Sequence, residues 1–159
     1  PPLIDESAGE APKEELPRQL DALAEAAVAA FSGTPVFVAY AYGSRIWGVA
    51  RPDSDLDVGY YTLPRADPAA LPMPTELRLA DWLSQAVGVE VDLRCLADAP
   101  LGLRGRALVE GRRVYCRDEV ARVNLERDLL SRYLDYKPQL EAMRELRFAA
   151  LAEKARQRQ

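Results

Sequence analysis

The stretch YGSRIWGVARPDSDLDV, residues 42–58, decides the fold, because it joins the end of one strand to the start of the next. The strand before it, VFVAYAY at residues 36–42, is a run of β-branched and aromatic residues, which is typical of a buried strand. The connection contains Gly43 and a turn-like segment at residues 51–54. A second strand is predicted over residues 55–61.

This second strand alternates between apolar and acidic positions. Leu56, Val58 and Tyr60 form one face, and Asp55 and Asp57 lie on the other, since side chains two residues apart in a strand point the same way. Two carboxylates held so close repel each other unless a cation neutralises them. Magnesium commonly binds one or two carboxylates together with substrate phosphates. The Asp-x-Asp pair therefore predicts a divalent metal site, although such a pair alone is also found on exposed strand faces.

The turn at Gly43-Ser44 is suited to a phosphate. Glycine allows close approach to the backbone, and the N–H groups of a helix start, with a serine hydroxyl, bind phosphate oxygens. A single Gly-Ser pair is more often an ordinary turn, so the prediction depends on the carboxylates that follow.

A third strand is predicted over residues 89–95, where Asp92 lies on the polar face. If this strand pairs with the second, Asp92 completes a group of three carboxylates, which can hold two metal ions. Glu90, two residues earlier, competes with Asp92 for the same role.

Together these parts resemble the signature of the polymerase β nucleotidyltransferase superfamily: Gly43-Ser44, ten intervening residues, then Asp55-x-Asp57, with a third carboxylate in Val91-Asp92-Leu93. The resemblance implies that Gly43 and Ser44 contact a nucleoside triphosphate. It implies that Asp55, Asp57 and Asp92 are catalytic and bind Mg²⁺, or Mn²⁺ in its place.

The length and the text from Pro100 to Asp135 resemble the minimal nucleotidyltransferase (MNT) branch, and the likeness covers roughly residues 20–136. Members of this branch are commonly antitoxins of HEPN–MNT toxin–antitoxin pairs, which transfer AMP from ATP to a tyrosine of the HEPN toxin. One departure is Ile46-Trp47-Gly48, which stands where the family often has Ala-Arg-Gly. Arg45 or Arg51 would have to supply the missing arginine, unless both are ordinary surface residues or activity is weakened.

The elements predict an α+β, or mixed α/β, fold with a small mixed sheet of three to five strands packed on helices. Residues 1–13 are expected to be a disordered tail, 14–116 the catalytic core, and 117–159 a helical C-terminal segment of the same domain. The remaining predicted elements are a loop over 64–74, helices over 14–31, 75–87, 101–110, from 118 and over 139–153, and a short strand over 113–116. Pro138 is expected to interrupt or kink the terminal helices.

Composition narrows the chemistry. The chain has 159 residues, 48% of them hydrophobic, which suits one domain with a real core. It has no histidine, which removes Ser-His-Asp and Cys-His catalysis, and its net charge of −4 disfavours binding of long nucleic acid. Cys95 and Cys116 form no Cys-x-x-Cys pair, and no apolar run is long enough to span a bilayer, so a cytoplasmic protein with reduced thiols is expected.

Several side chains have two interpretations. Trp47 could stack on a base or partner but fits a partly buried aromatic, and Trp82 is expected in the core. The arginines at 104, 106, 112 and 113 form either a docking patch or a solvated helix end. The apolar residues of the terminal helices are expected to be core, or alternatively to bind a partner.

The sequence thus predicts a metal-dependent transferase that acts on an acceptor hydroxyl, with a HEPN-type toxin as partner. Two alternatives stay open: a non-catalytic antitoxin that binds its toxin stoichiometrically, and a transferase acting on a nucleic-acid end or a small molecule.

Overall fold

The computed structural model describes residues 12–48, 51 and 53–158. In chain order, its elements are α1 (Pro12–Phe31), β1 (Val36–Tyr42), α2 (Ser44–Trp47), β2 (Leu56–Thr62), α3 (Met73–Val87), β3 (Val91–Cys95), α4 (Leu101–Glu110), β4 (Arg112–Cys116) and α5 (Glu119–Gln157). The predicted α+β class and the order of elements are confirmed. Residues 1–11 of the predicted tail lie outside the described residues.

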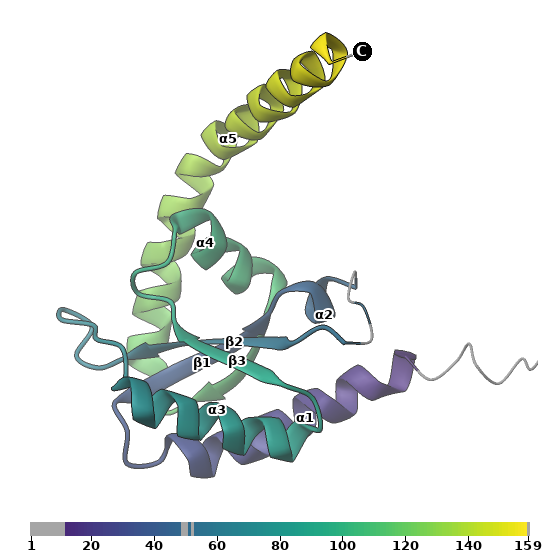
Figure 1. Cartoon of the computed structure of the whole chain (residues 1–159). Coiled ribbons are helices and arrows are strands. Elements are labelled where there is room, and N and C mark those ends of the chain that lie inside the picture. Colours follow the sequence, from purple (N-terminus) through teal and green to yellow (C-terminus); the bar gives the residue numbers. More distant parts are fainter. Residues whose placement is uncertain (1–11, 49–50, 52, 159) are drawn as a thin grey trace, which may run out of the picture.

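A mixed four-stranded sheet with the order β3-β2-β1-β4 forms the centre of the molecule (Figure 1). β1 pairs antiparallel with β2 and with β4, whereas β2 and β3 are parallel and are joined by α3. Since β3 is an edge strand, the residues on it border open solvent on one side.

Helices cover both faces of this sheet (Figure 1). α1 and α3 pack on one face, around a buried cluster that includes Phe31, Val58 and Leu83. α4 and α5 cover the other face, where Tyr40 and Leu129 belong to a second buried cluster. β1 is buried along its whole length because it is central and covered on both sides, which explains its uninterrupted apolar sequence.

The terminal helices differ from expectation. α5 is one helix of 39 residues that contains Pro138, and it bends along its length in Figure 1 instead of ending near Lys137. A proline inside a helix removes one hydrogen bond but does not end a helix whose turns on either side are otherwise intact. Asp118 caps the start of α5, because its carboxylate accepts a hydrogen bond from the Ala121 N–H at 3.0 Å.

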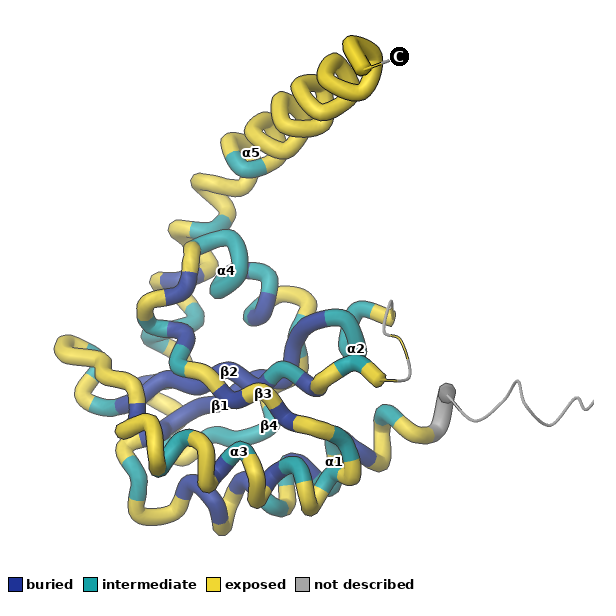
Figure 2. Tube along the Cα trace, in the orientation of Figure 1, coloured by how far each residue is buried: buried dark blue, intermediate teal, exposed yellow. Residues whose placement is uncertain are grey.

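The expectation that the apolar residues of α5 are core is wrong for most of them. Only Ala121 and Leu129 are buried, and the yellow tube of Figure 2 shows the far part of α5 exposed on all sides. Its exposed large apolar side chains are Val120, Val123, Leu130, Leu134, Tyr136, Met143, Leu146, Phe148 and Leu151.

Trp82 is also misplaced by the sequence pattern, because it is 46% exposed on the outer side of α3. Leu79 and Leu83 are the buried residues of that helix, and Ala80 and Val87 pack partly against the same cluster. Cys95 and Cys116 are free, half-buried thiols, as expected. None of the described helices is long and apolar enough to cross a membrane.

Candidate active site

Strand register brings two of the predicted carboxylates side by side. Asp57 is the second residue of β2, and its partner in the parallel strand β3 is Asp92. Their apolar neighbours Val58 and Leu93 belong to the cluster under α1 and α3, so the carboxylates lie on the opposite face, which α4 and α5 cover. Asp55 precedes β2 by one residue.

The same register separates Asp92 from Glu90. The Leu56 N–H donates to the Glu90 carbonyl at 2.8 Å, which leaves Glu90 beside the start of β2 and not opposite Asp57. Sequence alone could not make this choice, because a shift of two residues preserves the alternation of faces.

Asp57 is placed where a negative charge is costly. Burial raises the pKa of this carboxyl, and the nearby charges of Asp92 and then Asp55 raise it further. The positive charge of Arg94 lowers the pKa only in part. The three carboxylates are therefore close enough to sense one another, and a cation among them would relieve their repulsion.

Gly43 forms the floor beneath Asp57. Its φ of +88° and ψ of −166° lie in a region that is essentially restricted to glycine. A Cβ at this position would lie 2.1 Å from Asp57 Oδ2, so the carboxylate directly overlies the glycine. The Gly43 carbonyl accepts hydrogen bonds from the N–H groups of Ile46 and Trp47, each at 3.0 Å, and this closes the short helix α2 that begins at Ser44.

Arg45 and Arg51 shape the loop that leads into Asp55. Arg45 Nε donates to the Ser54 carbonyl at 2.5 Å. The Arg51 N–H donates to Ser54 Oγ at 2.9 Å, and the Ser54 N–H donates back to the Arg51 carbonyl at 3.0 Å. Arg45 thus contacts the loop that leads to Asp55 through its side chain, whereas these contacts of Arg51 are made by its backbone.

Two further residues belong to the site and were missed by sequence reasoning. Tyr42 is the β1 partner of Asp57, and Arg94 follows Asp92 by two residues on the same side of β3. Burial, followed by the charge of Asp57, raises the pKa of Tyr42 to about 12, so its hydroxyl keeps its proton at neutral pH. Arg94 lies close enough to lower the pKa of both Tyr42 and Asp57. The spacing Asp92-x-Arg94 was the available signal.

The donor set suits magnesium in chemistry, since all three groups supply hard oxygen ligands. Within the part of the chain that the structure describes, however, no three His, Cys, Asp or Glu side chains are grouped tightly enough to hold a metal ion. This arrangement fits an ion held by one or two carboxylates together with phosphate oxygens better than an ion enclosed by protein alone.

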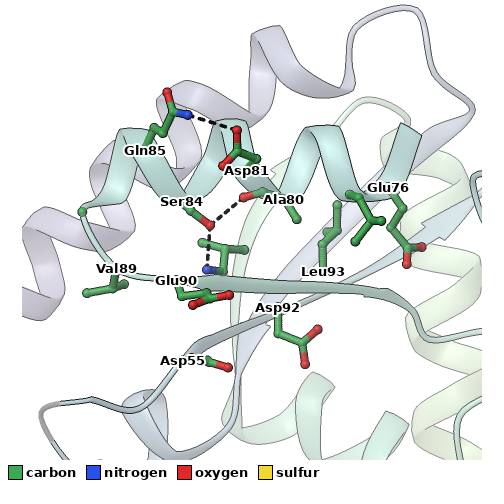
Figure 3. A pocket seen from close by; sticks show the side chains of 13 residues that line it. Asp55, Glu76, Ala80, Asp81, Ser84, Gln85, Val89, Glu90, Asp92 and Leu93 are labelled. Atoms are coloured by element: carbon green, nitrogen blue, oxygen red, sulfur yellow. Dashed lines mark hydrogen bonds between the residues drawn. The ribbon is translucent and has the colours of Figure 1, made fainter. Parts of the chain in front are cut away.

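A groove of about 700 Å³ runs between α3 and β3 and reaches Asp55 and Asp92 at its border (Figure 3). Ser84 fixes its wall: Ser84 Oγ donates to the Ala80 carbonyl at 2.7 Å and accepts from the Val91 N–H at 2.8 Å. This ties the start of β3 to α3 and thereby fixes the position of Asp92. In Figure 3 the Asp92 side chain extends from β3 away from α3, toward the side on which Asp55 lies.

The remaining aromatic and basic candidates have partners in the fold. The Arg106 guanidinium carbon lies 3.6 Å from the centre of the Trp47 ring, so this half-buried tryptophan packs under α4 as expected. Arg104 stacks on Tyr61, and Arg113 lies 3.7 Å from Glu126. The predicted arginine cluster is thus divided among different partners and forms no single docking patch.

The family described as Polymerase beta, Nucleotidyltransferase matches residues 28–120. No curated protein sequence matches the chain significantly.

Similar solved structures include chains from toxin–antitoxin complexes. A complex crystallised with AMP-PNP contains a chain with a TM-score of 0.57 and 17% identity, covering 80% of this chain and 97% of that one. A chain of the MntA–HepT toxin–antitoxin structure has a TM-score of 0.55 and 15% sequence identity, and the match covers 81% of this chain and 96% of that one. A third structure is the tri-AMPylated HEPN toxin of Shewanella oneidensis in complex with an MNT antitoxin. One of its chains has a TM-score of 0.54 and 15% sequence identity, and the match covers 82% of this chain and 96% of that one. At these identities the likeness shows a shared fold.

Proposed function

The chain belongs to the polymerase β nucleotidyltransferase family, whose model matches more than half of it, and on this premise we propose that it transfers AMP from ATP to a hydroxyl of a partner protein. The observation that carries the proposal is the register that sets Asp57 against Asp92, with Gly43 lying beneath the Asp57 carboxylate.

In this proposal Asp55 and Asp57 hold Mg²⁺ or Mn²⁺ together with the triphosphate of the nucleotide, and Asp92 acts as the general base. The metal would neutralise phosphate charge and help to lower the pKa of the acceptor hydroxyl. The protein contributes by holding together carboxylates that repel one another when no metal ion is bound. This repulsion favours binding of a cation at the site.

The nucleotide is held by the turn at the end of β1. The Ser44 hydroxyl and the N–H groups that open α2 can donate to phosphate oxygens, while the missing side chain of Gly43 leaves room for the Asp57 carboxylate above it. Arg94 takes the role of the arginine that Ile46-Trp47-Gly48 lacks, because its positive charge already lies beside Asp57. Arg45 and Arg51 support the triphosphate from the loop.

The reaction is an in-line displacement. The acceptor oxygen forms a bond to the α-phosphorus while the bond from that phosphorus to the β-phosphate oxygen breaks, and pyrophosphate leaves. The proton of the acceptor hydroxyl passes to Asp92, which is exposed at the sheet edge where an acceptor can approach.

The acceptor is proposed to be a tyrosine of a HEPN-type toxin, which makes the chain an antitoxin. Support comes from the shared fold with chains of toxin–antitoxin complexes, one of which contains a tri-AMPylated toxin. The position of Asp92 on an edge strand also suits an acceptor presented by another macromolecule. A second candidate, stoichiometric inhibition without transfer, is favoured by the exposed apolar side chains of α5, which suit a partner surface.

Thermal unfolding tests the catalytic proposal. Each nucleoside triphosphate is added with and without Mg²⁺ to wild type, to Asp57→Asn and to Asp53→Asn, an exposed loop residue with the same change of charge. At 100 times its dissociation constant a ligand stabilises by about 2.7 kcal/mol, which is roughly 5–10 °C for a chain of this size.

A Mg²⁺-dependent shift with ATP that disappears in Asp57→Asn and persists in Asp53→Asn is the expected result. No shift with any nucleotide would sink the transferase and leave the stoichiometric antitoxin. The acceptor is then tested by mass spectrometry of a HEPN protein incubated with the chain and ATP, where AMP on a tyrosine is expected.

A further inference from the structure

A second cavity lies at the other end of β2 from the carboxylates. Its volume is about 280 Å³, and it lies on the face of the sheet that α4 and α5 cover. Its wall is formed by these two helices and by the loop that follows β2. Thr62, which ends β2, lines this cavity, whereas Asp57 is five residues earlier. By the rise of a strand the two places are about 16 Å apart.

The charges around this cavity are mainly positive. Arg65, Arg104 and Arg132 line it, each from a different segment, and Asp128 is the one acidic residue among the described lining. Three guanidinium groups and one carboxylate give these lining residues a formal net charge of +2.

Two N–H donors of these arginines have a weak hydrogen-bond partner or none among the described residues. Arg65 Nη2 lies 3.0 Å from Asp128 Oδ2, yet Arg65 Nε is buried and has no hydrogen-bond partner among the described residues. Arg104 Nε reaches the Tyr61 hydroxyl only at 3.5 Å, which is a weak contact. A buried donor without an acceptor is costly, so an acceptor brought by a ligand would relieve it.

The rest of the wall strengthens attraction for an anion. Phe37, Leu125 and Leu129 contribute apolar surface, which excludes water and lowers the local dielectric. The Tyr61 hydroxyl keeps its proton at neutral pH, because burial raises its pKa, and it can donate to an anion. Thr62 is satisfied, since its hydroxyl donates to the Ala69 carbonyl and accepts from the Ala69 N–H.

We propose that this cavity, with Arg65, Arg104 and Arg132 on its wall, binds the phosphate group of a small molecule. A phosphate group carries roughly 1.5 to 2 negative charges at neutral pH, which matches the formal charge of +2 on the lining, and planar guanidinium groups bind its oxygens in pairs. The group could come from inorganic phosphate, pyrophosphate or a nucleoside monophosphate. The site is separate from the carboxylates and does not depend on their activity.

Isothermal titration calorimetry tests the proposal at constant ionic strength and without divalent metal. Inorganic phosphate, pyrophosphate and AMP are titrated separately into wild type, Arg65→Gln, Arg132→Gln, Arg144→Gln and Asp57→Asn. Arg144 is exposed on the far part of α5 and matches the change of charge without touching the cavity. Arg132 is exposed as well, so its variant keeps the test valid if Arg65→Gln fails to fold.

At least one of the three ligands is expected to bind, and the comparison among them identifies the source of the phosphate group. Its dissociation constant should rise about tenfold or more in Arg65→Gln and Arg132→Gln, and stay unchanged in Arg144→Gln and Asp57→Asn. Absence of binding by all three ligands, equal binding by all variants, or loss of binding in Asp57→Asn would overturn the proposal.

Discussion

Asp57 lies beside three residues that are distant from it in the sequence: Tyr42, its partner in β1; Asp92, its partner in β3; and Gly43, beneath its carboxylate. The sequence predicted the carboxylates and the glycine, because an alternating strand and a Gly-Ser turn are local patterns. It missed Tyr42 and Arg94, since their proximity follows from strand order and register, which depend on long-range pairing.

Replacing Asp57 by asparagine should stabilise the protein in the absence of metal. Its raised pKa means that the folded state binds this proton more tightly than the unfolded chain, so ionisation of Asp57 lowers stability as pH rises above the ordinary value of 3.8. We expect the melting temperature of Asp57→Asn at pH 7 to rise by about 2–4 °C.

The gain should shrink as the pH falls toward 3.8, where the wild-type carboxyl becomes neutral as well. Calorimetry in the presence of a metal chelator measures both effects, with the exposed Asp53→Asn as control. An Asp57→Asn protein that melts below wild type at pH 7 would contradict the repulsion inferred among the carboxylates.

Gly43 and Gly88 differ both in backbone strain and in crowding. The ψ of Gly43 is −166°, in a region essentially restricted to glycine, whereas the ψ of Gly88 is 7°, in the left-handed region that other residues tolerate at a modest cost. Both have positive φ, at +88° and +85°, but a Cβ on Gly43 would collide with Asp57 Oδ2, whereas nothing lies within 4 Å of one on Gly88. Gly88→Ala should therefore cost about 1 kcal/mol. Gly43→Ala should cost about 2–4 kcal/mol and also displace the Asp57 carboxylate. Denaturant unfolding measures the costs, and equal losses in the two variants would contradict the additional strain and crowding at Gly43.

At the level of elements, local sequence patterns located nearly every helix and strand to within about two residues. The exceptions have physical reasons. Pro138 was expected to interrupt or kink the terminal helices; it does not end α5, which continues as one helix and bends along its length in Figure 1. Trp82 and the apolar residues of α5 were assigned to the core by hydrophobicity alone, which does not show whether a neighbouring element exists to cover them.

The contact between α4 and α5 depends on the absence of a side chain at Gly105. A Cβ there would lie 2.1 Å from the ring of Tyr133 on α5, whereas one on Gly102 would meet Leu140 at 3.4 Å, an ordinary contact. Gly105→Ala should destabilise the protein by about 1–3 kcal/mol despite its better helix propensity.

Gly102→Ala should be neutral, or stabilising by up to about 1 kcal/mol, because it gains propensity without a clash. Denaturant unfolding of the two variants provides the comparison. If Gly105→Ala were as stable as Gly102→Ala, the close approach of α4 and α5 would not be needed for stability.

For the whole molecule, α5 divides into a part that packs on the domain and a part that does not. Residues 141–157 are exposed throughout, and an isolated helical segment of this length is marginal in water (Figure 2). We expect their amides to exchange with deuterium at least about tenfold faster than those of residues 121–133, as followed by mass spectrometry. Equal protection that weakened on dilution would instead show that a second copy covers this part.

The length of α5 also sets a spacing between partner and chemistry. A helix of 39 residues is about 58 Å long, and its exposed apolar side chains Leu146, Phe148 and Leu151 are near the end farthest from the sheet. A partner protein bound to this end of α5 would lie far from Asp57. It would have to send its acceptor back on a tail, about ten extended residues for every 33 Å. The length of α5 would then select acceptors by the length of the tail that carries the hydroxyl. The residues around the modified hydroxyl would contribute little to this selectivity.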